Sequence, residues 1–485
     1  MIGAATRRIN SRLMAYTTQF LPFADAASES LPLSQLLRLS LFQVSVGMAT
    51  VMLLGTLNRV MIVELSVPAV IVAVMIALPV LIAPFRALLG FRSDTHRSAL
   101  GWKRIPYLWF GSLWQMGGLA VMPFALLVLS GQQRVGPEWA GEVLAALAFI
   151  MTGLGLHMTQ TAGLALASDR ATDATRPRVV ALLYVMFLVG MAVSAIVIGL
   201  LLRDFSPLRL VRVVQGAASV GIILNLIALW KQEKVAPMTL AERSAPRPQF
   251  RDAWRDLMAG GTAGRLLAVV FIGTLAFNMQ DVLLEPYGGE VLGLSVAATT
   301  LLTAIWAAGA LGGFAIAGRA LLRGANTYRM AGNGLLIGLA AFATVIFAGP
   351  MQAPGLFFIG AALIGLGMGL FSVSTLTAAM TLSTGATAGN GLALGAWGAA
   401  QATAAGLAIA IGGGLRDTIS HLALSGRLGE ALANNATGYS IVYHTEIALI
   451  FLTLIVLGPL VRYGVQGGQT PRDDAARIGL ADFPT

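Results

Sequence analysis

Twelve apolar stretches, most of about 20 residues or more, run through the chain with short charged segments between them. A helix of about 20 residues spans the hydrocarbon core of a bilayer, which is about 30 Å thick. We therefore expect an all-α membrane protein with twelve transmembrane helices. The expected spans are 38–62, 68–89, 105–130, 141–167, 179–202, 210–230, 265–285, 294–318, 328–349, 355–380, 390–415 and 442–463.

The composition agrees with this class and excludes several others. Of 485 residues, 56% are hydrophobic and 11% are charged, whereas soluble domains carry about 25% charged residues. The chain has no cysteine, which excludes structural disulfides, thiolate metal sites, iron–sulfur clusters and covalently attached haem. In a soluble protein a net charge of +10 could indicate nucleic acid binding. In a multispan membrane protein the excess of Lys and Arg instead fixes the orientation of the chain in the bilayer, so we expect no nucleic acid partner.

The distribution of cations predicts the orientation. With the N-terminus in the cytoplasm, the cytoplasmic segments hold 25 Lys and Arg residues and the opposite side holds seven. Cytoplasmic loops of membrane proteins are enriched in Lys and Arg, so both termini are expected in the cytoplasm. A basic segment around Arg7, Arg8 and Arg12 predicts a helix that lies on the lipid surface, with a frayed tail as the alternative.

The longest cytoplasmic connection divides the chain into six spans and six. It carries mixed charge and three prolines within Lys231–Gly261. We expect a cytoplasmic N-terminal segment, a six-helix bundle, a linker, a second six-helix bundle and a tail, at 1–36, 37–230, 231–263, 264–463 and 464–485.

The loop between spans 2 and 3, "GFRSDTHRSALGWKR", is similar to the gating-loop signature of the major facilitator superfamily, G-x-x-x-D-[RK]-x-G-[RK]-[RK]. In that signature the Asp caps a helix or pairs with an Arg, and the cations hold the cytoplasmic gate. The alternative is that these cations only set the orientation of the chain. The loop departs from the signature by four extra residues between the Asp and the second Gly. The residues that match are Gly90, Asp94, Gly101, Lys103 and Arg104.

Longer strings point to one branch of this superfamily. "GTLNRVMIVEL", "APFRALLGFRSDTHRSALGWKRIPYLWFG", "LHMTQTAGLALASDRATDATRPRVVALLYVMFLVGM" and "QDVLLEPYGG" resemble the PucC and LhaA family of bacteriochlorophyll-delivery proteins. The resemblance implies a fold of two six-helix bundles and an assembly factor for a light-harvesting complex, with the core antenna favoured over the peripheral one. It implies bacteriochlorophyll a or a late precursor as cargo, with carotenoid as a further candidate. The implied partners are the antenna α and β polypeptides, bacteriochlorophyll synthase, the membrane insertion machinery and the lipid bilayer.

Six residues within the spans are candidates for contact with such a pigment. His157 lies near the middle of span 4, and the side chains three and four residues later share its helical face. A neutral imidazole is a suitable axial ligand for the magnesium of bacteriochlorophyll, and a hydrogen bond to a neighbouring helix is the alternative role. Large aromatic side chains are candidates for stacking on the macrocycle, with ordinary packing as the alternative. The candidates are His157, Gln160, Thr161, Phe277, Trp306 and Trp397.

A second group of polar residues lies near the outer ends of spans 1 and 7. A charge inside a helix costs about 2.5 to 3.5 kcal/mol on insertion scales, so a partner or a water-filled cavity is expected. We predict that Arg59 pairs with Asp281 or Glu285 and closes the outer side, with contact to a polar group of the pigment as the alternative. The group comprises Asn58, Arg59, Glu64, Asn278, Gln280, Asp281 and Glu285.

Two other functions remain open from the sequence. A secondary transporter of a small molecule or tetrapyrrole has the same fold, but ion-coupled transporters usually place carboxylates at mid-membrane. The spans hold few carboxylates beyond Glu64, Asp281 and Glu285, which argues against energised transport. A pigment synthase would need a metal-binding carboxylate cluster, and none is visible, so we expect no enzymatic activity and no directly bound metal.

Overall fold

The computed structural model describes residues 26, 28 and 31–463 with short gaps. The gaps are residues 66, 68, 99, 132–135, 138, 173–174, 203–204, 234, 236, 238, 240–248, 260, 295, 383–389 and 435. The backbone alone is described at residues 59, 62, 63, 69, 70, 73, 282, 296, 297, 299–301, 303 and 463. The proposed basic helix near Arg7 and the tail after 463 lie outside the described residues.

Every regular element in the described part of the chain is a helix, and twelve helices are long and apolar enough to cross a membrane. The expected number of spans is therefore confirmed. The longest helix, α17, runs over Asn390–Leu424 and so extends past its predicted end at residue 415.

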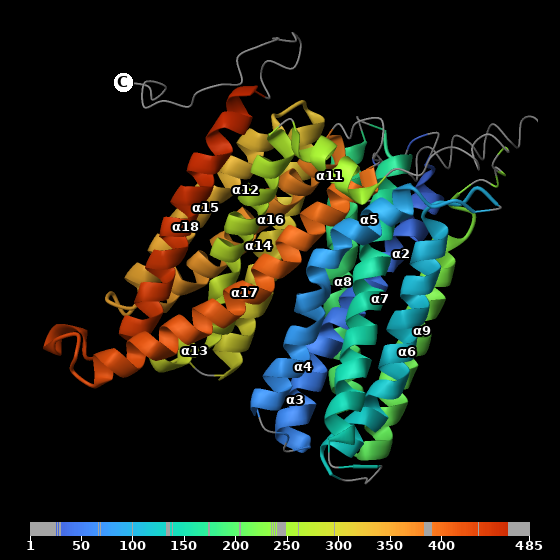
Figure 1. Ribbon diagram of the computed structural model, residues 1–485. Coiled ribbons are helices and arrows are strands. Elements are labelled where there is room, and N and C mark those ends of the chain that lie inside the picture. Colours follow the sequence, from blue (N-terminus) through green and yellow to red (C-terminus); the bar gives the residue numbers. More distant parts are fainter. Residues whose placement is uncertain are drawn as a thin grey trace, which may run out of the picture.

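The first group of helices comes from the N-terminal half of the chain and is blue to green in Figure 1. Its elements are α2 (Leu33–Thr50), η2 (Val51–Thr56), α3 (Leu57–Arg59), η3 (Val60–Glu64), α4 (Ala69–Ile82), η4 (Ala83–Phe85), α5 (Arg86–Asp94), α6 (Ile105–Leu129), α7 (Ala140–Arg170), α8 (Arg176–Leu201) and α9 (Pro207–Leu229).

The second group is yellow-green to red in the same view. Its elements are α11 (Phe250–Ala259), α12 (Thr262–Asn278), η5 (Met279–Val282), α13 (Leu284–Glu290), α14 (Val296–Leu322), α15 (Thr327–Ala348), α16 (Pro354–Thr381), α17, η6 (Glu430–Leu432) and α18 (Ala436–Tyr463).

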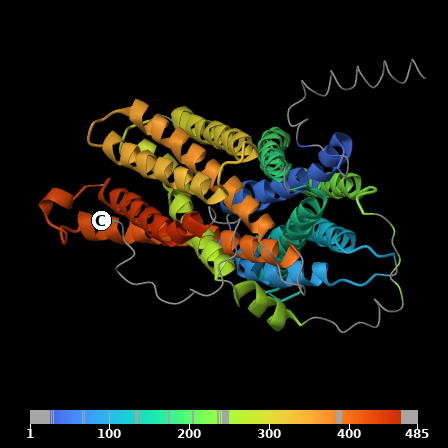
Figure 2. The same ribbon diagram turned by 90° about the horizontal axis from the view of Figure 1, so that it is seen from above.

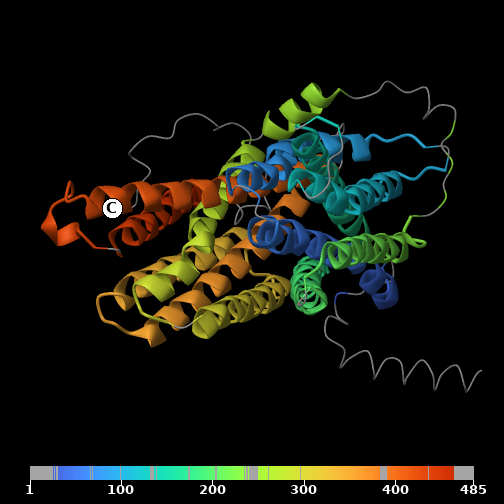
Figure 3. The same cartoon turned by 90° about the horizontal axis from the view of Figure 1, so that it is seen from below.

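Each group packs mainly within itself. In the first group α6 packs on α7 and α9, and α2 packs on α8 and α9. In the second group α16 packs on α14 and α15, while α12 packs on α17 and α18. Figures 2 and 3, which view the molecule from above and from below, show the two groups side by side. The domain boundaries given above stay a prediction.

The two groups meet mainly at one end of the molecule. α17 contacts α5 and α7, and α8 contacts α14 and α16. In Figure 1 these contacts lie toward the upper end, while the lower ends near α3 and α13 are apart. We call the upper end, where α5, α11 and α17 come together, the locked end.

Small residues allow the close approach of α5 and α17. A Cβ atom on Gly90 would collide with the carbonyl of Gly391, and one on Gly395 would collide with the carbonyl of Arg86. Without a strong hydrophobic force between helices in lipid, such backbone contact is a main source of helix association. The two halves therefore depend on glycine where they meet.

The short helix α11 covers this junction. Its Ala253 and Leu257 are buried against Phe91 of α5 and Leu392 of α17. The ring of Phe250 packs edge-on against Phe91, with 5.5 Å between the ring centroids. This segment, which the sequence suggested only as part of a linker, joins both groups of helices at the locked end.

Replacing Gly90 by Ala should separate the two groups, because the added methyl group has no space beside the Gly391 carbonyl. We expect a lower thermal midpoint of the detergent-solubilised protein. Gly216→Ala in α9 is the matched control, because its Cβ atom would meet open space and alanine favours a helix by about 0.5 to 1 kcal/mol over glycine. Equal midpoints for the two variants would contradict this account of the junction.

Candidate functional site

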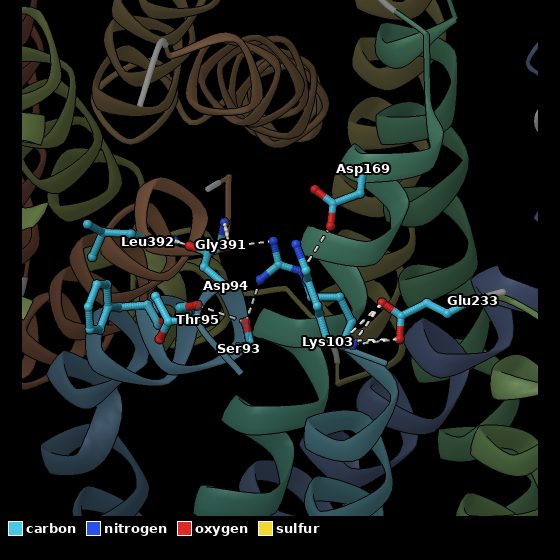
Figure 4. Close-up of polar contacts among 11 residues, drawn as sticks. Ser93, Asp94, Thr95, Lys103, Asp169, Glu233, Gly391 and Leu392 are labelled. Atoms are coloured by element: carbon cyan, nitrogen blue, oxygen red, sulfur yellow. Dashed lines mark hydrogen bonds and ion pairs between the residues drawn. The ribbon is translucent and has the colours of Figure 1, made fainter. Parts of the chain in front are cut away.

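Asp94 joins the two halves at the locked end. Its carboxylate accepts hydrogen bonds from the backbone N–H groups of Gly391, at 2.9 Å, and Leu392, at 2.7 Å (Figure 4). These amides belong to the first turn of α17, where no carbonyl of the helix itself can satisfy them. A carboxylate at this place also interacts favourably with the helix dipole. Asp94, at the C-terminus of α5, thus caps α17 of the other half.

Arg104 holds this carboxylate from the opposite side. Its guanidinium forms an ion pair with Asp94, and its Nε donates to Asp169 of α7 over 2.9 Å. Burial by itself would lower the pKa of Arg104, but the charges of Asp169 and Asp94 outweigh burial and raise it. The Asp94 and Arg104 side chains are each 3% exposed, so solvent screens their attraction little.

A second carboxylate caps α6 directly after Arg104. Glu233, just beyond α9, accepts hydrogen bonds from the backbone N–H groups of Lys103, Arg104 and Ile105 over 3.1 to 3.3 Å. The loop reaches this position through Gly101, whose φ of 78° lies in the left-handed region that favours glycine. The Lys103 side chain is exposed and the backbone of that residue makes the contact.

Three of the five signature residues therefore meet at one point, and Gly101 shapes the loop. Gly90 contacts α17, Asp94 caps α17, and Arg104 pairs with Asp94. The sequence analysis did not single out the partners Asp169, Glu233, Gly391 and Leu392. Gly391 lies almost 300 positions from Asp94 in the sequence. The groups that bind Asp94 are the backbone N–H groups of Gly391 and Leu392, and a backbone N–H leaves no trace in a sequence motif.

Arg86 is a second buried cation, one that the sequence analysis did not single out. Pro84 has no N–H to donate, and the chain passes through the 3₁₀ segment η4 before α5 begins at Arg86. The side chain is 2% exposed, and its Nε donates to Thr161 Oγ1 of α7 over 3.1 Å. No carboxylate pairs with it among the described residues, and its Nη2 has no hydrogen-bond partner there. The signal in the sequence that could have identified Arg86 was a single Arg within the predicted span 68–89.

His157 lies on the same face of α7 as Thr161. Its Nε2 is 2.9 Å from the carbonyl oxygen of Pro79. A carbonyl only accepts, so Nε2 carries the proton and, in the neutral ring, Nδ1 carries the lone pair. Nδ1 is buried and has no partner in the described structure. The two roles predicted for His157, a hydrogen bond to a neighbouring helix and ligation of magnesium, thus involve different ring atoms. Nε2 makes a hydrogen bond to α4, and Nδ1 is the atom that could act as a ligand.

The remaining pigment candidates lie in different surroundings. Phe277 is fully buried among Phe342 and Phe371, with ring centroids 6.3 and 5.9 Å away, so in this conformation it packs the second group of helices. Trp397 is buried and Trp306 is partly buried, and the indole N–H of each has no partner among the described side chains. Gln160 is partly buried beside His157 and Thr161.

The predicted outer-end group spreads over several elements. The Arg59 side chain lies outside the described residues, so its pairing with Asp281 or Glu285 stays a prediction. Asp281 is exposed and accepts a hydrogen bond from Gln280 over 2.6 Å. The members that are described further are the partly buried Asn58 and Glu64, the exposed Glu285, and Asn278, which is buried and donates to the Thr274 carbonyl.

One buried carboxylate within a span was not singled out from the sequence. Glu446 of α18 is fully buried beside the backbone of Gln280, and no cation pairs with it in the described part of the chain. The hydroxyl of Tyr443, one turn earlier, is also buried without a partner, and the charge of Asp281 acts on Glu446. The spans therefore hold an intramembrane carboxylate beyond those the sequence analysis considered. A lone Glu in the apolar run 442–463 was the signal.

Comparison with known proteins places this geometry in a family. The family model described as "PUCC protein" matches residues 56–465. The chain belongs to the PucC family. It is 63% identical over 479 residues to an "Uncharacterized protein in puhA-bchM intergenic region" of Rhodobacter capsulatus, with 99% of each chain covered. It is 55% identical to "Protein PucC" of Rhodovulum sulfidophilum, with 84% of this chain and 90% of that protein covered.

Solved structures show the fold of this PucC family member. A bacterial homologue of the iron transporter ferroportin in an outward-facing state aligns with a TM-score of 0.69 at 16% identity, covering 88% of this chain and 98% of the other. The major facilitator superfamily proton:xylose symporter XylE aligns with a TM-score of 0.62 at 16% identity, covering 88% and 95%. The expected major facilitator fold is confirmed.

Removing the charge of Asp94 should weaken the locked end strongly. In Asp94→Asn, the buried Arg104 loses one of its two carboxylates and α17 loses part of its cap. Breaking one side of a buried pair costs about 3 to 5 kcal/mol. Asp169→Asn is the matched control, since Asp169 is 37% exposed and caps no helix of the other half. Thermal unfolding in detergent should rank wild type above Asp169→Asn and Asp169→Asn above Asp94→Asn, and the reverse order of the two variants would contradict the assignment.

Proposed function

We propose that this protein is an assembly factor for a bacterial light-harvesting antenna that binds bacteriochlorophyll a, or a late precursor, between its two groups of helices. It supplies the pigment to the α and β polypeptides as they enter the membrane. The core antenna is the favoured client, and carotenoid is a further candidate cargo. The protein acts as a holder of pigment and not as an enzyme.

One observation carries this proposal: a PucC family member holds unpartnered polar atoms inside an apolar core. His157 Nδ1 and Arg86 Nη2 are buried and lack partners among the described residues. Buried polar groups are normally paired, because an unpaired one costs about 1 to 3 kcal/mol. Unpaired groups gathered in one place are therefore candidates for contact with a ligand.

His157 fits a magnesium-bearing macrocycle in its chemistry. The bound pigment would supply an open axial position on magnesium, and Nδ1 is the ring atom with a lone pair to fill it. The hydrogen bond from Nε2 to Pro79 fixes the tautomer and the orientation of the ring, as second partners do for metal-bound histidines. Nδ1 is enclosed in the conformation described, so binding requires that the helices around it move apart.

The expected setting follows from the cation distribution and the locked end. We propose that the locked end faces the cytoplasm, because Arg92 and Arg104 and, on α11, Arg251 and Arg255 lie there. The proposed location is the inner, photosynthetic membrane, with bacteriochlorophyll synthase and the insertion machinery as partners. In this orientation the opposite end, near α3 and α13, which we call the open end, faces away from the cytoplasm.

Protein purified in mild detergent from pigmented cells should show the near-infrared absorbance of bacteriochlorophyll. His157→Ala should lower the pigment-to-protein ratio about tenfold or more, because loss of an outer-shell or direct ligand typically costs that much affinity. Thr159→Ala is the matched control, since Thr159 is also buried on α7 but contacts Gly111 of α6. A colourless wild-type preparation, without antenna polypeptides or pigment synthase bound, would contradict the proposal.

A secondary transporter of a small molecule or tetrapyrrole is the second candidate, and Glu446 favours it. Ionisable residues buried within spans commonly mark ion or proton pathways. A colourless preparation whose vesicles accumulate substrate only in the wild type and not in Glu446→Gln would select this function over pigment delivery.

A further inference from the structure

Among the described residues, no carboxylate pairs with Arg86. The guanidinium is almost fully buried, its Nε is used by Thr161, and Nη2 has no partner in the part of the chain that the structure describes. An intramembrane Arg is normally paired or faces water. A buried guanidinium with a free Nη2 is therefore a candidate for binding an anionic group.

Two other polar side chains lie around Arg86. His157 lies one turn before Thr161, the partner of Arg86 Nε, and Tyr184 of α8 lies near the same guanidinium. His157 Nδ1 is buried without a hydrogen-bond partner among the described atoms, and the buried Tyr184 hydroxyl lies close to the side chains of Ser372 and Gln401. A cation, a hydroxyl and a lone pair thus converge from α5, α7 and α8.

These groups lie at the junction of the two halves. A Cβ atom on Gly398 of α17 would collide with the Arg86 guanidinium, so the cation packs directly against the other half. Tyr184 packs against Phe314 of α14, with 5.0 Å between ring centroids. Arg86 lies eight residues before Asp94, about 12 Å deeper along the helix at 1.5 Å per residue. Movement of α17 away from α5 would open this space to a ligand.

We propose that Arg86 binds the free carboxylate of a tetrapyrrole, so that the protein receives the unesterified acid in preference to the finished pigment. The planar guanidinium presents paired N–H groups that match a carboxylate in two parallel hydrogen bonds. Finished bacteriochlorophyll carries its propionate as an ester of a long-chain alcohol and offers no such charge there. The late precursor carries the same group as a free acid. This inference rests on the proposed function and names the form of the cargo.

An anionic lipid headgroup presents related chemistry, and depth argues against it. Arg86 lies about 12 Å inside the locked end and is covered by protein, whereas headgroups lie at the surface of the bilayer. The carboxylate of a tetrapyrrole that enters between the two groups of helices can reach Arg86 at this depth.

The test compares bacteriochlorophyllide a with its methyl ester, binding each to the full-length protein in nanodiscs of neutral lipid and following pigment absorbance. The two probes differ only in charge at the propionate. Wild type should bind the acid about tenfold or more tightly than the ester. Arg86→Gln should bind both probes with the affinity that wild type has for the ester. Arg86→Lys should keep part of the preference for the acid, because the ammonium group of Lys still provides a positive charge. Size-exclusion profiles and thermal midpoints identify any variant that does not fold.

Equal affinity of the wild type for acid and ester would overturn the inference without need of any variant, as would a preference that persists in folded Arg86→Gln. Displacement of the acid by an equal amount of phosphatidylglycerol would assign the site to a lipid headgroup and also overturn it. Failure of both probes to bind wild type would instead count against pigment delivery itself.

Discussion

The carboxylate of Asp94 is the interaction on which the arrangement of the two halves depends. The first turn of α17 presents unpaired N–H groups where two helices come close enough for backbone contact, and water has little access there. A buried amide without a partner is costly, so α17 can approach α5 only because Asp94 accepts from it. Arg104 compensates the buried carboxylate, and Asp169 ties that pair to α7. One capping residue thus sets the distance between the two groups of helices.

Other features of the molecule follow from this contact. Because α5 and α17 meet through glycine, the Arg86 guanidinium is enclosed against Gly398 beneath the lock, and His157 is enclosed beside it. α11 covers the same junction from outside. The lock closes one end of a polar centre in which Arg86 Nη2 and His157 Nδ1 lack partners among the described residues. A ligand that supplies those partners would have to loosen the contact at α17, and so binding and closure of the locked end are physically coupled.

The sequence predicted the features that depend on local composition. Span number follows from apolar runs, and the gating loop follows from Gly90, Asp94 and Arg104 at characteristic spacing. The structure was needed for features that depend on long-range packing. The partners of Asp94 are backbone amides of α17, which no pattern of side chains reveals. Arg86 and Glu446 were visible as single charges in apolar runs. Their burial without an oppositely charged partner among the described residues depends on helices far away in the sequence.

The most direct test of this account is a pair of distances measured between spin labels in the full-length protein, which has no native cysteine to interfere. One pair, Arg92→Cys with Arg323→Cys, reports on the locked end, and the other, Trp139→Cys with Met351→Cys, reports on the open end. All four positions are exposed. The account predicts that Asp94→Asn lengthens and broadens the first distance, whereas Asp169→Asn changes it less. An unchanged first distance in folded Asp94→Asn would contradict the central role given to this carboxylate.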